Sequence, residues 1–233
     1  MHIQSVSGCC LAVALTMLLS PASGQTPAAS AKTLPRLQHS VVASAASNAR
    51  QALGQLGPLV TPQTFRDLGF ESEKEISRAE LGEPMHVYMV RLDHLRGFEA
   101  NSDADKLLVE TNEVIFPVRV AGQVRTGLTM RLVDGTWQFS SFGGSPLVRA
   151  LSHTSEGLAA RSKSDDEGRF AVRIPALHAY FVGYREQKAL FLTAAADDAR
   201  FKLRQGETLP AEKVFAALAP YAREYKTGAK LVD

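Results

Sequence analysis

The segment spanning residues 114–142 constrains the fold of this chain more than any other. Apolar residues recur at every second position over 114–120 and, except at Thr126, again over 124–132, and the short stretch 121–123 separates the two runs. Asp134-Gly135 then precedes a third run, in which Trp137 and Phe139 alternate with polar residues. A period of two is typical of strands, and short loops containing Gly join antiparallel neighbours. The segment therefore predicts a three-stranded meander.

The two turns also predict which residues lie opposite each other. With 121–123 as the first loop, Val120 faces Val124 and Arg119 faces Arg125. With Asp134-Gly135 as the second turn, the expected pairs are Leu132 with Trp137, Met130 with Phe139 and Arg131 with Gln138. The apolar residues of all three strands then lie on one side of the sheet.

Helices and further strands are expected on both sides of the meander. Helical spacing of apolar residues predicts helices over 41–56, 145–161 and from Leu209 to Pro220, and a capping box at Ser72–Glu75 predicts a short one. Apolar runs predict a covered strand over 85–92 and strands over 169–194. We expect an α+β fold in which an antiparallel sheet, made of the meander 114–142 and the strands of 169–194, packs against helices.

The N-terminus has the pattern of a signal peptide. The first 31 residues contain no charged side chain, and the apolar run Cys9–Leu19 is followed by small residues ending in Gly24. We predict cleavage after Gly24, because Ala22 and Gly24 fit the −3 and −1 positions. The run is too short for a bilayer span, which needs about 20 apolar residues, so no transmembrane segment is expected after cleavage. Lipidation at Cys9 is disfavoured because the apolar run follows that cysteine instead of preceding it.

These boundaries divide the chain into a signal peptide (1–24), a flexible linker (25–40) and one α+β domain (41–233). Two smaller units, about 65–142 and 145–233, are the alternative. Both cysteines, Cys9 and Cys10, precede the cleavage site, so an exported chain would hold together by core burial and not by disulfides. A formal net charge of +2 is too small to indicate a nucleic-acid partner.

The arginines of the strands are the best candidates for a binding surface. Arg119 opposite Arg125 would be a like-charge pair, which is destabilising unless an anion lies between the two side chains. Arg131 and Arg173 would extend such a surface toward an acidic protein or an anionic envelope component. The alternative is an ordinary solvated sheet face, or pairing with acidic residues of a neighbouring helix.

A hydrolase site is the competing hypothesis. Ser145 lies between a strand and a helix, as in a nucleophile elbow, and Asp165 and His178 follow in the order of an α/β-hydrolase triad. Position 147 is Leu where that motif requires Gly, so we favour Ser145 as a helix N-cap with Pro146 in the first helical position.

No metal or cofactor site is predicted. The stretch 101–112 begins like a calcium loop, but Lys106 and Asn112 replace the Gly and Glu that such a loop requires. The histidines have no HExxH spacing, and neither a Walker motif nor a dinucleotide fingerprint is present. The sequence thus favours an exported, periplasmic or secreted, non-enzymatic binding or accessory protein, with a secreted hydrolase using Ser145 as the alternative.

Overall fold

A computed structural model describes residues 34–99, 102–161 and 168–225, with the side chains of the first helix described from Ser44 onward. The predicted signal peptide, residues 1–24, lies outside the described residues, as does Asp165. The described chain forms a nine-stranded sheet and four α-helices, joined by short 3-10 helices.

The first half of the chain contains α1 (Leu34–Gln55), η1 (Gly57–Leu59), η2 (Glu73–Arg78), β1 (Glu80–Leu81), β2 (Met85–Val90), α2 (Leu92–Arg96), η3 (Ala104–Leu107), β3 (Leu108–Val120), β4 (Gln123–Val133) and β5 (Thr136–Gly143). The second half contains α3 (Ser145–Arg161), β6 (Phe170–Ile174), η4 (Pro175–Leu177), β7 (Ala179–Glu186), β8 (Ala189–Ala194), β9 (Thr208–Pro210) and α4 (Ala211–Glu224).

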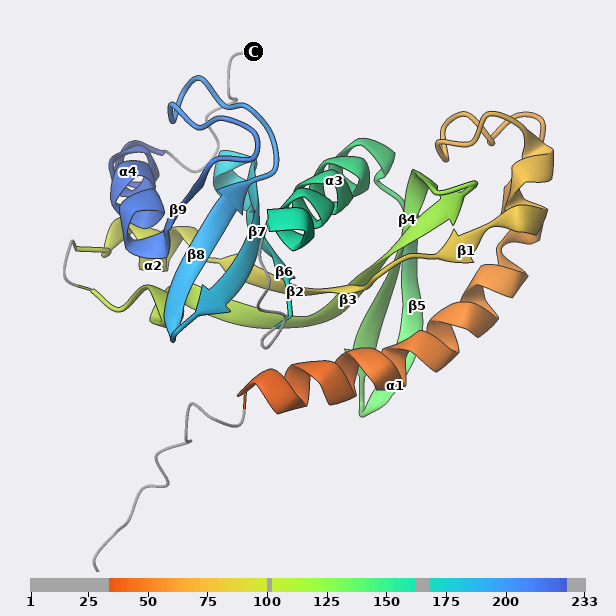
Figure 1. The fold of residues 1–233 in the computed structure, drawn as a ribbon, viewed down its shortest axis with the longest axis horizontal. Helices are drawn as coiled ribbons and strands as arrows, with labels where there is room; N and C mark the ends of the chain where they lie inside the picture. Colours follow the sequence, from red (N-terminus) through yellow and green to blue (C-terminus); the bar gives the residue numbers. More distant parts are fainter. Residues whose placement is uncertain (1–33, 100–101, 162–167, 226–233) are drawn as a thin grey trace, which may run out of the picture. The chain divides into compact units, whose positions relative to one another are not determined.

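The sheet is mixed, and the expectation of an antiparallel sheet is wrong. The strand order is β5-β4-β3-β2-β6-β7-β8-β9, with β1 paired beside β2 on β3. Every pair of named strands is antiparallel except β2 and β6, which run parallel, with His86 opposite Phe170. Parallel neighbours require a long crossover, and α3 belongs to the connection that brings β6 beside β2. Two antiparallel halves, β1–β5 and β6–β9, therefore meet at one parallel pair, which we call the seam (Figure 1).

The predicted meander forms, and its second turn has the predicted register. Leu132 pairs with Trp137, Arg131 with Gln138 and Met130 with Phe139 across the Asp134-Gly135 turn. The first turn is one residue shorter than expected, because Ala121 and Gly122 both adopt positive φ and form the loop alone. Val120 therefore pairs with Gln123 and Arg119 with Val124, so the predicted Arg119–Arg125 pair is wrong.

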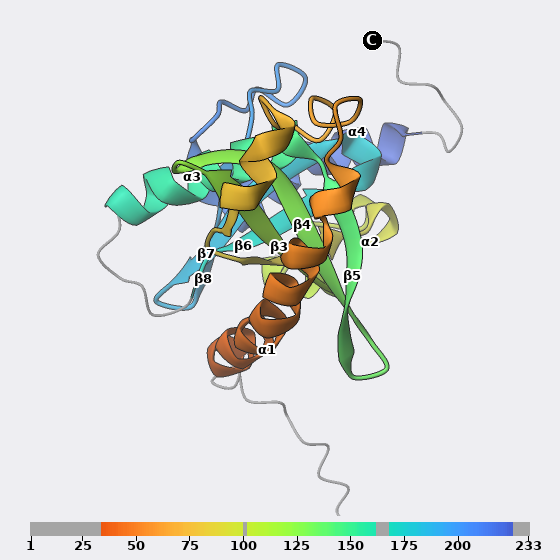
Figure 2. The same ribbon diagram turned by 90° about the vertical axis from the view of Figure 1, so that its right-hand side faces the viewer.

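Helices cover both faces of the sheet. Helix α3 packs on one face, where Val148 and Leu151 join Val87, Ala171 and other residues from both halves. On the opposite face, α1 covers β3, β4 and β5, whereas α2 and α4 cover the strands of the second half (Figures 1 and 2). Each strand at the centre of the sheet is therefore buried on both sides, and this explains the nearly continuous burial of β2.

Helix α1 begins at Leu34, earlier than the residue 41 expected from the sequence. Its buried stripe contains the small residues Ala45, Ala49 and Ala52, which let the helix approach the sheet closely. The Nδ2 atom of Asn48 donates to the Trp137 carbonyl at 2.8 Å, and the Trp137 indole donates to the Ser44 hydroxyl at 2.9 Å. The thin apolar stripe thus packs on this chain's own sheet.

Two expected helix ends differ from the structure. Ser72 makes no side-chain capping bond, and the Glu75 carboxylate accepts from the Glu71 amide at 2.8 Å, so the predicted capping box does not form. The segment 73–78 is a 3-10 helix, in which the spacing of residues differs from that of an α-helix. Pro220, expected to end or kink the last helix, lies inside α4, which continues to Glu224.

Candidate functional site: a charged pocket beneath helix α3

The four arginines predicted as a binding face contact three separate groups of carboxylates within the chain. Arg119 pairs with Glu156 of α3, whereas Arg125 pairs with Glu71 at 2.7 Å and with Glu75 at 2.9 Å. Arg131 and Arg173 both pair with Glu113 of β3. The structure thus shows an intramolecular partner for each arginine, and contact with another molecule stays a prediction.

Glu113 lies between two arginines from different halves of the sheet. Burial is the largest single effect on this carboxyl group and would raise its pKa, but the hydrogen bonds and the positive charges of Arg131 and Arg173 together outweigh it. The pKa of Glu113 is therefore lowered, and the group carries its negative charge at neutral pH. The side chain of Glu113 is 9 % exposed, against 28 % for Arg173 and 54 % for Arg131.

His86, in β2, is a buried titratable group. Its Nε2 atom lies 3.2 Å from a carboxylate oxygen of Glu110, although neither ring nitrogen has a hydrogen-bond partner of good geometry among the described residues. Burial lowers the pKa of His86, and the opposing attraction of Glu110 offsets only part of that shift. The ring contacts Tyr88, with centroids 5.0 Å apart, and serves as part of the packed sheet.

Ser145 is the first residue of α3, and its side chain is buried. The hydroxyl donates to the Leu68 carbonyl at 3.2 Å and packs closely on Gly69, where an added Cβ would lie 2.3 Å from Oγ. The predicted N-cap role is wrong, because this hydroxyl holds the 61–70 segment in place of a helix amide. His178 follows η4 in a left-handed conformation (φ 52°), and its role as a catalytic partner, like that of Asp165, stays a prediction.

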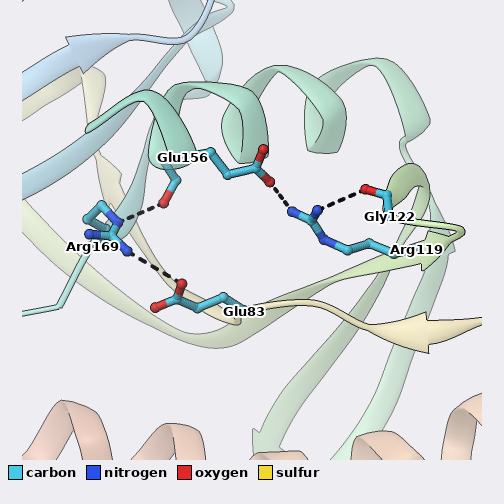
Figure 3. Close-up of polar contacts among 6 residues, drawn as sticks. Glu83, Arg119, Gly122, Glu156 and Arg169 are labelled. Atoms are coloured by element: carbon cyan, nitrogen blue, oxygen red, sulfur yellow. Dashed lines mark hydrogen bonds and ion pairs between the residues drawn. The ribbon is translucent and has the colours of Figure 1, made fainter. Parts of the chain in front are cut away.

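A pocket of about 60 Å³ lies between α3 and the sheet. Helix α3 contributes Ser152, Ser155, Glu156 and Ala159, the first half of the sheet contributes Glu83, Met85, Pro117 and Arg119, and Arg169 precedes β6. Figure 3 shows Glu156 directed toward Arg119, and Arg169 directed toward Glu83. The pocket thus combines residues from both halves of the sheet with the helix that joins them.

Local sequence explains how these side chains come together. The four α3 residues follow the spacing i, i+3, i+4 and i+7, which places them on one face of the helix. Gly82 breaks the strand between β1 and β2, and its amide donates to the Pro117 carbonyl at 2.6 Å. A Cβ at Gly82 would lie 2.6 Å from Nε of Arg119, so a glycine at this position leaves space for the arginine side chain.

The two arginines of the pocket contact different sets of partners. Arg119 pairs with Glu156 and also donates to the Gly122 carbonyl at 3.0 Å. Arg169 donates from Nε to the Ser155 hydroxyl at 2.9 Å, and its Nη2 atom lies 3.4 Å from the Glu83 carboxylate. Arg169 is only 15 % exposed, whereas Glu83 is 77 % exposed. A buried cation therefore meets a carboxylate that lies mostly in solvent.

Ser152 distinguishes this pocket from an ordinary surface ion-pair network. Its side chain is 3 % exposed, and its hydroxyl has no hydrogen-bond partner among the described residues. A buried polar group without a partner costs about 1–3 kcal/mol. Such groups call for an explanation, and one explanation is a ligand that supplies the missing bond.

The pocket combines charged, polar and apolar side chains. Its lining includes cations, carboxylates and hydroxyls, together with the apolar residues Met85, Pro117 and Ala159. Arg and Ser side chains offer hydrogen-bond donors in the geometry that carboxylates and phosphates accept. Among the described residues, no three acidic, histidine or cysteine side chains are grouped so as to hold a metal ion.

Sequence reasoning found only Arg119 of this pocket. The helical face at 152, 155, 156 and 159 was a usable signal, because two hydroxyls and a carboxylate recur there at helical spacing. Glu83 and Arg169 gave no such signal, since they meet only through the parallel seam.

Within the described part of the chain, no helix has the length and apolar character needed to span a bilayer.

Comparisons with known proteins give no family for this chain. No protein-family model matches it, and neither a curated protein nor a solved structure shows significant similarity to it. Its function must therefore be argued from the geometry and chemistry of the site itself.

Proposed function

We propose that this protein is an exported, non-enzymatic binding protein, and that it binds an anionic group in the pocket beneath α3. Ser152 is the single observation that carries this proposal, because this residue lines the same pocket as two arginines and its buried hydroxyl has no hydrogen-bond partner among the described residues. The signal-peptide pattern of residues 1–24 supports export to the periplasm or the extracellular space.

The difference in exposure between Arg169 and Glu83 favours replacement of Glu83 by a ligand. An ion pair with one partner in solvent contributes only about 0–1 kcal/mol, so the contact between Arg169 and Glu83 is easily replaced. A ligand carboxylate or phosphate could accept from Arg169 and from the Ser152 hydroxyl together. The ligand would then gain two hydrogen bonds, while Glu83 would give up its contact with Arg169.

The alternative of a hydrolase with Ser145 as nucleophile is not supported by any contact of that residue. Its hydroxyl is buried and donates to a backbone carbonyl. A nucleophile needs a base within hydrogen-bond reach, and none of the described hydrogen bonds of Ser145 joins it to a histidine.

Titration with acetate and with inorganic phosphate, followed by amide NMR shifts, tests the proposed site. We expect saturable shifts at the amides of Ser152, Ser155 and Arg169. In Arg169→Gln these shifts should be lost, whereas Arg91→Gln should behave like the original protein, because Arg91 is an exposed arginine that pairs with Asp93 and does not line the pocket. Equal responses from both variants, or no saturable shift with either anion, would refute the proposed site.

A further inference from the structure

We propose that the pocket beneath α3 recognises an α-amino-acid head group, that is, an ammonium and a carboxylate borne on one carbon atom. This inference rests on the proposed binding function and names the class of ligand. Four observations support it: the charge balance of the pocket, the geometry of its weaker ion pair, the unpartnered Ser152 hydroxyl and the size of the pocket.

The pocket contains equal numbers of positive and negative side chains. Within the lining of the pocket, Arg119 pairs with Glu156 and Arg169 with Glu83. An anion alone that took the place of Glu83 would leave that carboxylate without a partner beside a second negative charge. A zwitterion avoids this cost, because its carboxylate replaces Glu83 on Arg169 while its ammonium pairs with Glu83.

The two ion pairs differ in how readily they would open. Glu83 lies 3.4 Å from Nη2 of Arg169, longer than the usual charge-assisted hydrogen bond of about 2.7–2.9 Å. Arg119 lies closer to its carboxylate, that of Glu156, and also donates to the Gly122 carbonyl (Figure 3). The exchange is therefore expected at Glu83 and not at Glu156.

Ser152 supplies a donor for the second oxygen of the ligand carboxylate. Ser152 lies on the α3 side of the pocket, and its buried hydroxyl has no partner among the described residues. A carboxylate accepts several hydrogen bonds at once, so Arg169 and Ser152 can serve its two oxygens. The missing hydrogen bond of Ser152 would thus be made only when a ligand is present.

The size of the pocket limits the ligand to a small head group. Its volume is about 60 Å³. The apolar contacts of Met85, Pro117 and Ala159 suit a Cα atom and at most a short side chain. Glycine and alanine fit this description, and a longer side chain would have to extend past Glu83 or Glu156 into solvent.

An NMR titration with four small probes tests the inference. Glycine carries both charges, acetate only the carboxylate, methylammonium only the ammonium, and glycinamide lacks the carboxylate. We expect glycine to bind at least 10-fold more tightly than any of the other three, with shifts at Ser152, Glu83 and Arg169. Ser152→Ala should weaken the binding of both glycine and acetate, because both present a carboxylate to that hydroxyl.

Glu83→Gln separates the zwitterion from the anion. This side chain is mostly in solvent, so the variant should fold, as its amide spectrum will show. Glu83→Gln should reduce the affinity for glycine to that for acetate. Glu212→Gln, on the exposed face of α4, is the control and should leave the affinity for glycine unchanged. If acetate binds the original protein as tightly as glycine does, the proposal of a zwitterionic ligand is overturned, whereas the proposal of an anion site is retained. No shift with any probe would overturn both proposals.

Discussion

At the scale of single residues, Glu113 joins two parts of the sheet that are distant in sequence. Arg131 reaches it from β4 and Arg173 from β6, while Glu113 itself belongs to β3. A buried carboxylate needs such partners, because an ionised group taken out of water is costly unless hydrogen bonds and opposite charges surround it.

Glu113→Gln should therefore lower the free energy of unfolding by about 2 kcal/mol at pH 7, since it leaves the partly buried Arg173 without its carboxylate. Urea denaturation measures this difference. Arg131→Gln is the control, and it should cost at most about 1 kcal/mol, because Arg131 is half exposed.

The pH dependence of the same variant has a definite sign. A carboxyl group whose pKa is lowered by folding contributes stability above its ordinary value of 4.5, and that contribution is lost as the pH falls through the folded-state value. The difference in the free energy of unfolding between the original protein and Glu113→Gln should accordingly become smaller below pH 4.5. A gap that stays constant on acidification would show that the charge of Glu113 is not the cause.

Alternation along the strands predicted which residues share a face of the meander, but not which carboxylate each arginine contacts. The partners of Arg125 and Arg173 are distant in sequence, and a period of two carries no information on them. The Arg119–Arg125 register failed for a local reason. Ala121 adopts a positive φ that a sequence pattern would not assign to alanine, and this shortens the loop by one residue.

At the scale of elements, the contact between α3 and β4 depends on Gly127. A Cβ added there would lie 2.6 Å from Cγ2 of Val148 and 3.2 Å from the Gly143 carbonyl oxygen. Helix and strand are thus in direct contact at this point.

Gly127→Ala should lower the free energy of unfolding by about 1–3 kcal/mol, because overpacking forces the helix away from the sheet. Gly54→Ala in α1 is the matched control: nothing lies within 4 Å of its added Cβ, and alanine favours helix over glycine by about 0.8–1.0 kcal/mol. Thermal unfolding of the two variants should show shifts of opposite sign. A stabilised Gly127→Ala would mean that α3 can shift freely on the sheet.

Most helices and strands could be predicted from the sequence, because they are long enough to show a clear period. The helix over 145–161 and the strands of the meander follow from this pattern. Parallel pairing could not be predicted, since β2 and β6 have similar apolar runs whichever direction they pair in. The pocket was missed for the same reason, because its residues meet only once the seam has formed.

At the scale of the whole molecule, the seam between β2 and β6 joins the two halves, and His86 lies on it opposite Phe170. Burial lowers the pKa of His86, so the folded protein binds a proton there less readily than the unfolded chain does. The unfolded state then holds more protons below the ordinary value of 6.5, and stability falls as the pH drops below it.

We expect the free energy of unfolding to decrease between pH 6.5 and 5, and His86→Phe to reduce that dependence, because phenylalanine does not titrate. Urea denaturation at several pH values measures the slope. His153→Gln, which changes an exposed histidine on α3, should retain the slope of the original protein. An unaltered slope in His86→Phe would assign the acid sensitivity to other groups.

The seam also determines the order in which the molecule can assemble. Its two strands are farther apart along the chain than those of any other pair in the sheet, so the loop that must close before they meet is the longest and has the greatest entropic cost. Local hairpins such as β4–β5 can form early, whereas the pairing of β2 with β6 is expected to form later. The α3 pocket, which spans both halves, is therefore among the last parts to form in refolding. A bound ligand would join the halves directly, and its main effect would be to slow unfolding.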